Sequence, residues 1–154
     1  MRIQFFPGPE LEAKLTTEAE IQGVNIGILV VDALNKYYGL VGPNMKTEAQ
    51  LEKEVLDEIA AYVAEPTNAN KEFDLNEAST TYTQIDMTYA GKPRVVKARI
   101  GKTFAKEVGL PGGRFGTVEQ VLLANGKPKR TVGNRAALYR ILTDAEIDRD
   151  NERN

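Results

Sequence analysis

Apolar and polar residues change their period near the start of the chain. Residues 2–6 alternate and place Ile3 and Phe5 on one side, and the Pro-Gly-Pro sequence at 7–9 ends the alternation. A period of two is typical of a short β-strand. The next apolar residues recur every four positions after a proline and a glutamate, so the sequence predicts a helix over residues 9–22.

Two further helices are predicted before residue 66. Asn25 can cap the first of them, and Gly39 marks its end. Thr47 and Gln50 can form a capping box ahead of the other, whose apolar residues also recur at helical spacing. The polar residues 66–72 that follow are predicted to be a linker.

The second half of the chain has shorter elements. Its most regular helical pattern covers residues 98–108, and Asn125 with Gly126 is a strong signal for a hairpin turn. The last strand should place Tyr139 on one face and Arg140 on the other. The pattern predicts a helix near 74–79, an alternating segment at 83–89, strands at 117–124, 127–132 and 136–142, and a charged tail at 143–154 that is frayed or at most helical.

Charge divides the chain into unlike parts. The net charge is −2, but residues 1–60 carry five basic and ten acidic side chains, whereas residues 88–142 carry twelve basic and two acidic ones. A strongly basic segment is the expected footprint of a polyanion-binding surface. The distribution indicates one part that binds a polyanion and another part with a different role, and a surface bias without function is the alternative.

The composition removes several kinds of chemistry. The chain has neither cysteine nor histidine, so disulfides, thiolate metal sites and the commonest general base are missing. The longest apolar run, residues 28–31, is far shorter than the ~20 residues that cross a bilayer. We expect a cytoplasmic protein without cofactor, metal or membrane contact that is not an enzyme. A metal-dependent nuclease is the enzymatic alternative, but the basic part offers few carboxylates.

The N-terminal quarter resembles the ribbon-helix-helix family of bacterial and phage repressors. The resemblance rests on the strand at 2–6, the sequence Pro-Glu-Leu-Glu-Ala-Lys-Leu that starts the first helix, the turn at 23–25 and the sequence Asp-Ala-Leu-Asn-Lys-Tyr-Tyr at 32–38. Members of that family pair their strands into an antiparallel ribbon between two chains. The resemblance therefore implies a homodimer that forms through residues 1–40.

The same resemblance assigns DNA contacts to the ribbon and to the second helix. In that family the ribbon enters the major groove, and the N-terminus of the second helix holds a phosphate. By position, the ribbon residues are Arg2, Gln4 and Phe6, and the phosphate contacts are Asn25 and Ile26. The acidic charge of this part of the chain opposes phosphate binding, so a ribbon that serves only to dimerise is an equal alternative.

The basic part offers a second candidate surface for DNA. One face of the helix at 98–108 is basic and the opposite face is apolar, and a hairpin with a basic tip follows. This order resembles a winged-helix domain, where one helix enters the major groove and the wing touches the backbone. The candidate contacts are Arg99, Lys102, Thr103, Lys106, Lys127, Lys129 and Arg130. A solvated amphipathic helix beside a lysine-rich turn is the plainer alternative.

Two further features of residues 73–142 bear on their role. They are similar to a family of small bacterial domains of unknown function, which supplies no catalytic residues. The matching features are Glu-Phe-Asp-Leu at 72–75, the run at 98–108, Asn134 with Arg135, and Tyr139 with Arg140. Tyr82, Tyr89 and Tyr139 could stack on unpaired bases, so single-stranded DNA or RNA stays an alternative to duplex DNA.

Together these patterns predict an α+β protein. It would consist of a ribbon-helix-helix unit with a third helix at 1–65, a linker at 66–72, a small winged-helix-like α+β domain at 73–142 and the tail at 143–154. The expected function is that of a dimeric DNA-binding protein, a transcriptional regulator that holds duplex DNA through its basic helix and hairpin. The alternative is an antitoxin-like or other protein-interaction module whose basic part binds an acidic protein.

Overall fold

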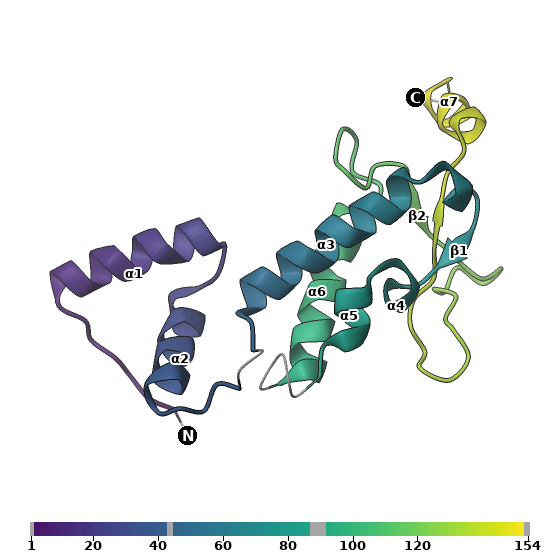
Figure 1. The fold of residues 1–154 in the computed structure, drawn as a ribbon. Helices are drawn as coiled ribbons and strands as arrows, with labels where there is room; N and C mark the ends of the chain where they lie inside the picture. Colours follow the sequence, from purple (N-terminus) through teal and green to yellow (C-terminus); the bar gives the residue numbers. More distant parts are fainter. Residues whose placement is uncertain (1, 43–44, 87–91, 153–154) are drawn as a thin grey trace.

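The structure is a computed structural model that describes residues 2–42, 45–86 and 92–152. Helices and a small antiparallel sheet make it an α+β protein, as predicted (Figure 1). Its elements in chain order are α1 (Pro9–Gln22), α2 (Ile26–Tyr37), α3 (Glu48–Ala64), the 3-10 turn η1 (Pro66–Asn68), β1 (Glu72–Phe73), α4 (Leu75–Ala78), α5 (Thr80–Gln84), α6 (Pro93–Glu107), β2 (Val118–Gln120), β3 (Tyr139–Ile141) and α7 (Asp144–Glu152).

The first two helices begin and end where their capping residues predict. Gly23 ends α1 with a φ of 67°, a left-handed conformation that a residue with a side chain rarely adopts. The Asn25 side chain accepts a hydrogen bond of 3.0 Å from the Ile28 amide at the start of α2. Thr47 and Gln50 form the predicted capping box at the start of α3. These predictions are confirmed.

Residues 2–8 form neither helix nor strand in the single chain. A lone extended segment has no partner for its backbone amide and carbonyl groups, so a strand there requires a second segment beside it. The predicted partner of this segment is the same segment of a second chain, and the structure describes one chain. The ribbon therefore stays a prediction.

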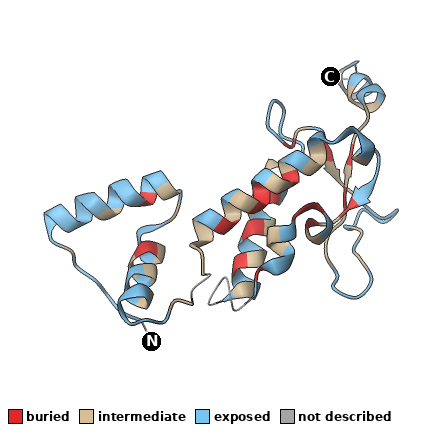
Figure 2. Ribbon diagram, viewed as in Figure 1, coloured by how far each residue is buried: buried red, intermediate tan, exposed pale blue. Residues whose placement is uncertain are grey.

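The hydrophobic core joins α3 to the second part of the chain. Figure 2 shows buried residues concentrated in α3, α4, α6 and the sheet, while α1 and α2 are mostly exposed. The core consists of Leu51, Val55, Leu56, Ile59, Phe73, Leu75, Ala78, Ile85, Val96, Ile100, Phe104, Phe115, Val118, Tyr139 and Ile141. The predicted domain boundaries placed α3 in one unit with α1 and α2. The structure places it in the core with α6, because its apolar side chains are buried there.

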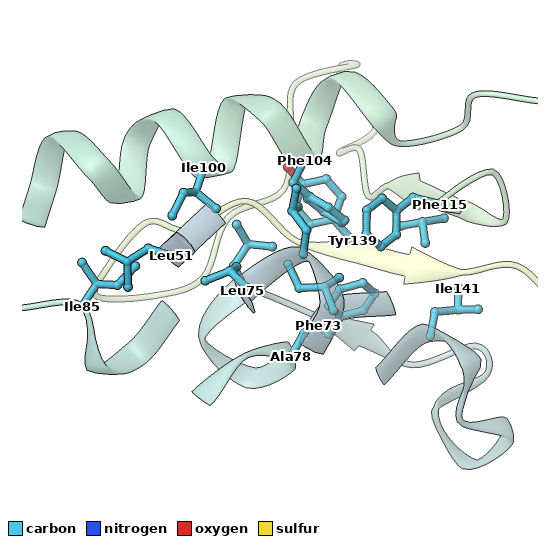
Figure 3. Close-up of a cluster of buried hydrophobic side chains, with 14 of the residues drawn as sticks. Leu51, Phe73, Leu75, Ala78, Ile85, Ile100, Phe104, Phe115, Tyr139 and Ile141 are labelled. Atoms are coloured by element: carbon cyan, nitrogen blue, oxygen red, sulfur yellow. The ribbon is translucent and has the colours of Figure 1, made fainter. Parts of the chain in front are cut away.

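Four aromatic rings occupy the centre of this core (Figure 3). The Phe104 ring of α6 lies 4.9 Å from the Phe115 ring and 4.8 Å from the Tyr139 ring, centre to centre, both edge to face. The Tyr139 ring of β3 also lies 6.1 Å from the Phe73 ring of β1. Edge-to-face pairs add to the free energy of burying the rings, so this cluster binds α6 to the sheet.

The sheet has the strand order β1-β3-β2, and both pairings are antiparallel. Tyr139 lies opposite Phe73 on one side and Gln120 on the other. Tyr139 is buried and Arg140 is half-buried on the opposite face, as the alternation predicted. The strands at 117–124 and 136–142 are confirmed in shorter form.

The hairpin is less regular than predicted. Its Asn-Gly turn forms, with the Gly126 amide 2.8 Å from the Leu123 carbonyl oxygen. The predicted strand at 127–132 is reduced to isolated bridges at Pro128 and Arg130. Proline has no amide hydrogen, so a continuous ladder cannot pass through Pro128.

Two further elements differ from the prediction. The predicted alternating segment at 83–89 instead begins inside α5, where the buried Ser79 hydroxyl caps the helix by accepting a hydrogen bond from the Tyr82 amide. Residues 87–91 of that segment lie outside the described residues. α6 begins at Pro93, five residues before the predicted start, since proline is well suited to a first helical turn. The tail forms α7.

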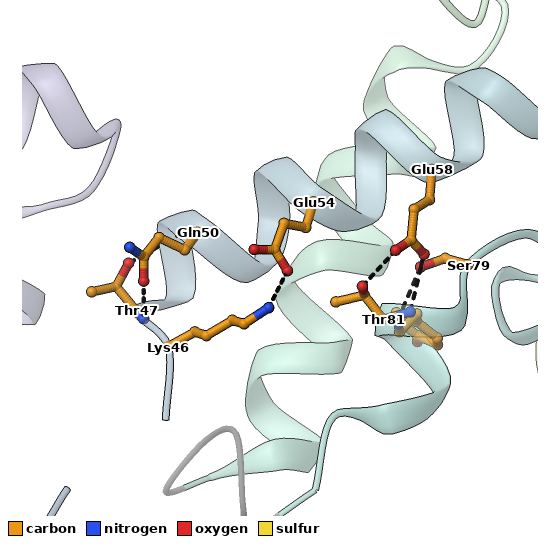
Figure 4. A network of polar contacts seen from close by, with 8 residues as sticks. Lys46, Thr47, Gln50, Glu54, Glu58, Ser79 and Thr81 are labelled. Carbon is orange, nitrogen blue, oxygen red and sulfur yellow. Dashed lines mark hydrogen bonds and ion pairs between the residues drawn. The ribbon is translucent and has the colours of Figure 1, made fainter. Parts of the chain in front are cut away.

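One carboxylate ties α3 to α5 (Figure 4). Glu58 accepts hydrogen bonds from the Ser79 hydroxyl at 2.7 Å, the Thr81 hydroxyl at 2.6 Å and the Thr81 amide at 3.0 Å. Burial acts to raise the pKa of Glu58, but these hydrogen bonds outweigh it, so the pKa lies below its ordinary value of 4.5. The ionised form is therefore the one that holds the two helices together.

We predict that Glu58→Gln makes the stability of the protein less dependent on pH in acid. A carboxylate whose pKa is lowered in the folded state stabilises the fold above its unfolded pKa, and this contribution is lost as the pH falls through the folded pKa. The free energy of unfolding, measured by urea titration, should therefore fall more steeply below pH 4.5 for the wild type than for the variant. At pH 7 the substitution should lower the free energy of unfolding by about 2 kcal/mol.

Glu54→Gln is the matched control. Glu54 lies on the same helix but makes an ion pair with Lys46 that is partly exposed. Its replacement should cost less than about 1 kcal/mol. Parallel pH profiles for the wild type and Glu58→Gln would show that the carboxylate does not hold α3 to α5.

Candidate nucleic-acid interface

Packing against the core fixes which face of α6 points outward. Val96, Ile100 and Phe104 are buried on its inner face. Lys102 and Lys106 are exposed on the outer face, as the helical pattern predicted. A helix held by buried side chains on one side cannot rotate, so these two lysines stay directed to solvent.

α3 covers one edge of the basic face of α6. The Arg99 guanidinium forms an ion pair of 2.9 Å with Glu48, and the Thr103 hydroxyl donates a hydrogen bond of 3.1 Å to Glu52. Both acidic partners lie on α3. Two of the four predicted contacts on this helix therefore already have partners within the protein.

The hairpin divides its basic residues in the same way. Lys129 forms an ion pair of 2.7 Å with Glu72 and so braces the hairpin on β1. The Arg130 guanidinium donates a hydrogen bond of 2.8 Å to the Arg135 carbonyl oxygen, which orients the side chain but leaves its charge uncompensated. Lys127 is exposed beside the turn.

The basic residues do not form one continuous group. Figure 1 shows the turns of the hairpin, residues 121–138, well apart from the body of α6. Four of the twelve basic residues between 88 and 142 form ion pairs, namely Arg99, Arg114, Lys129 and Arg140. Within the described ranges, the predicted contacts without an ion pair are Lys102, Lys106, Lys127 and Arg130.

The sequence did not reveal which cations have partners. Arg114 pairs with Glu107 at the end of α6 and with Asp57 on α3, and Arg140 pairs with Glu119 and Glu146. Two of these four pairs, Arg114 with Asp57 and Arg140 with Glu119, join residues far apart in the chain. Only the folded arrangement brings them together, so no spacing rule could have identified them.

The predicted contacts of the N-terminal part are placed less favourably for DNA. Arg2 and Gln4 are exposed in the segment without helix or strand. Asn25 uses its side chain as a helix cap and borders a cavity of about 350 Å³ that Glu48 and Glu52 also line. Lys53 and Arg114 line the same cavity, so two cations offset its two carboxylates, and the cavity favours neither interpretation of the ribbon.

The candidate stacking tyrosines belong mainly to the core. Tyr139 is only 5% exposed, and burial raises its pKa. Tyr82 packs against the core with the Lys97 ammonium 5.0 Å from its ring centre. Tyr89 lies outside the described residues. Tyr82 and Tyr139 therefore offer little open ring surface for an unpaired base.

Neither metal ligands nor a membrane span were found in the described part of the chain. No group of three or more acidic side chains there converges as a metal site would require. No helix among residues 2–42, 45–86 and 92–152 has the length and apolar character to cross a bilayer.

The N-terminal helices leave most of their apolar side chains in solvent. Of residues 2–42, only Ala19 and Leu29 are buried. The exposed large apolar residues are Ile3, Phe5, Phe6, Leu11, Ile21, Ile26, Val31, Leu34, Tyr37, Tyr38 and Leu40. Exposed apolar surfaces are typical of interaction sites in general, so α1 and α2 carry a candidate interaction surface.

A function for this chain has to follow from its own contacts and charges. Compared with protein-family models, with curated proteins and with solved structures, the chain matches none.

Proposed function

We propose that this protein is a dimeric DNA-binding protein that regulates transcription, and that residues 48–141 hold duplex DNA in the manner of a winged-helix domain. The order of elements supports this proposal, because α6 follows shorter helices and leads into two antiparallel strands joined by a hairpin. The pairing of β3 with both β1 and β2 is consistent with it. In this proposal α3 is the first helix of the winged-helix unit.

The outer face of α6 is the observation that carries the proposal. Lys102 and Lys106 are exposed, lie four residues apart and have no carboxylate partner among the described residues. Positions four apart lie on the same side of a helix, so both ammonium groups can reach one phosphate backbone. Lysine contacts of this kind neutralise phosphates and release counterions, which favours binding to duplex DNA of any sequence.

The hairpin supplies the second contact in this proposal. Lys127 and Arg130 would touch the DNA backbone beside the groove that α6 enters. Lys129 would not take part directly, because it braces the hairpin against Glu72. The proposal thus assigns DNA contacts to only some of the basic residues of α6 and the hairpin.

The N-terminal helices would form the dimer. A second copy of the chain can pair residues 2–6 as a ribbon and cover the exposed apolar side chains of α1 and α2 at the same time. A single two-fold symmetric interface would pair the strands and bury the apolar side chains, because the same surface of each chain takes part in it. A dimer would also present two copies of α6 to neighbouring sites on DNA.

We predict that the double variant Lys102→Glu and Lys106→Glu binds duplex DNA at least tenfold more weakly than the wild type, for all sequences alike. Loss of two phosphate contacts should also reduce the slope of log affinity against log salt by about 2. Fluorescence anisotropy with labelled duplexes at two salt concentrations measures both effects.

The matched control is the double variant Lys14→Glu and Lys71→Glu. It changes the net charge equally, and both lysines are exposed, Lys14 on α1 and Lys71 directly before β1, and neither is among the proposed DNA contacts. It should retain most of the affinity. Equal binding by the Lys102 and Lys106 variant and the wild type would exclude α6 as the DNA-binding helix.

We predict that the wild type is a dimer and that Leu34→Asp makes it a monomer. Leu34 is 48% exposed on α2, so a carboxylate there does not disturb the core of the single chain but does enter the proposed contact. Sedimentation velocity at micromolar concentration measures the change, and circular dichroism checks that the helices remain. Leu123→Asp is the control, because Leu123 is equally exposed, at 48%, on the hairpin. A wild type that sediments as a 17.0 kDa monomer would contradict the prediction.

A further inference from the structure

The contact between α3 and α6 repeats over one helical turn. Glu48 and Glu52 lie four residues apart on α3, and their partners Arg99 and Thr103 lie four residues apart on α6. The two helix edges therefore face each other over a full turn. A chance contact would occur at one position, whereas here two successive turns have polar partners. The acidic edge of α3 therefore runs along the basic face of α6.

The members of the ion pair differ in their exposure. The Glu48 side chain is 15% exposed and the Arg99 side chain is 55% exposed. Glu48 is thus held in place by its surroundings, whereas the guanidinium borders solvent and could reach a second anion. A phosphate that approached Arg99 would come close to the Glu48 carboxylate, and the two negative charges would repel each other.

We propose that Glu48 and Glu52 act as an internal substitute for DNA phosphate that closes the Arg99 edge of α6 to DNA. The proposal rests on the DNA-binding role of α6. In the bound complex, phosphates contact the Lys102 and Lys106 side of the helix, and Arg99 stays with α3. Glu48 therefore lowers the affinity of the protein for DNA and sets which side of α6 faces the backbone.

This arrangement makes affinity a competition between two anions for one guanidinium. An ion pair whose guanidinium is more than half exposed contributes little free energy, so small changes can shift the competition. The cavity of about 350 Å³ that Glu48 and Glu52 line is also bordered by the turn between α1 and α2, including Asn25.

Glu48→Gln tests the proposal. The variant keeps the shape of the side chain and removes its charge, so Arg99 becomes available to phosphate. Binding of a labelled 20-base-pair duplex at low salt, measured by fluorescence anisotropy, should become about threefold tighter. The gain should largely disappear when Arg99 is already replaced, so Glu48→Gln in the Arg99→Ala background is expected to bind like Arg99→Ala alone.

Glu54→Gln is the matched control for general charge. It lies on the same helix and removes the same charge, but its partner is Lys46 and not a residue of α6. It should leave the affinity close to that of the wild type. Glu52→Gln is a second test variant, which should also tighten binding, and thermal denaturation checks that each variant is folded.

The outcomes separate this proposal from the proposed function. If the wild type binds duplex DNA but Glu48→Gln binds equally or more weakly, the internal competitor is excluded and the role of α6 stands. The internal competitor is also excluded if Glu54→Gln raises the affinity for DNA as much as Glu48→Gln does. It is excluded as well if Glu48→Gln raises the affinity fully in the Arg99→Ala background, because the change in net charge would then explain the effect. A wild type that does not bind duplex DNA would exclude both.

Discussion

The packing of Phe104 against Phe115 and Tyr139 is the contact on which the arrangement of the second part of the chain depends. It joins a helix, a glycine-rich loop and the central strand of the sheet at one point (Figure 3). Because a closely packed core allows little rotation of its helices, this contact fixes the outward direction of the opposite face of α6. The exposed position of Lys102 and Lys106 is a consequence of that packing.

Electrostatic contacts then divide the basic residues into two groups. Those that lie against α3 or β1 find carboxylates, as Arg99 and Lys129 do, and contribute to the fold. Those that point away from the core keep their charge available to a ligand. The large positive charge of residues 88–142 therefore overstates the cationic surface that a ligand can meet, since ion pairs within the protein neutralise part of it.

The two ends of the chain differ in how completely they bury their apolar residues. The core around α3 and α6 is closed, and Glu58 adds a polar tie between α3 and α5. α1 and α2 have caps that define their ends but no core of their own, with only Ala19 and Leu29 buried in that part of the chain. Local signals are enough to form a helix end, whereas burial needs surfaces from elsewhere, here from a proposed second chain.

Capping and periodicity in the sequence were enough to locate α1, α2 and α3 and to identify the inner face of α6, because these depend on residues within a few positions of each other. The membership of α3 in the core with α6 was beyond sequence reasoning, and so were the partners of Arg99 and Lys129. Glu48 and Arg99 are 51 residues apart, and no local pattern connects them. Their contact exists only because the apolar faces of two distant helices are buried together, which places the polar edges of those helices side by side.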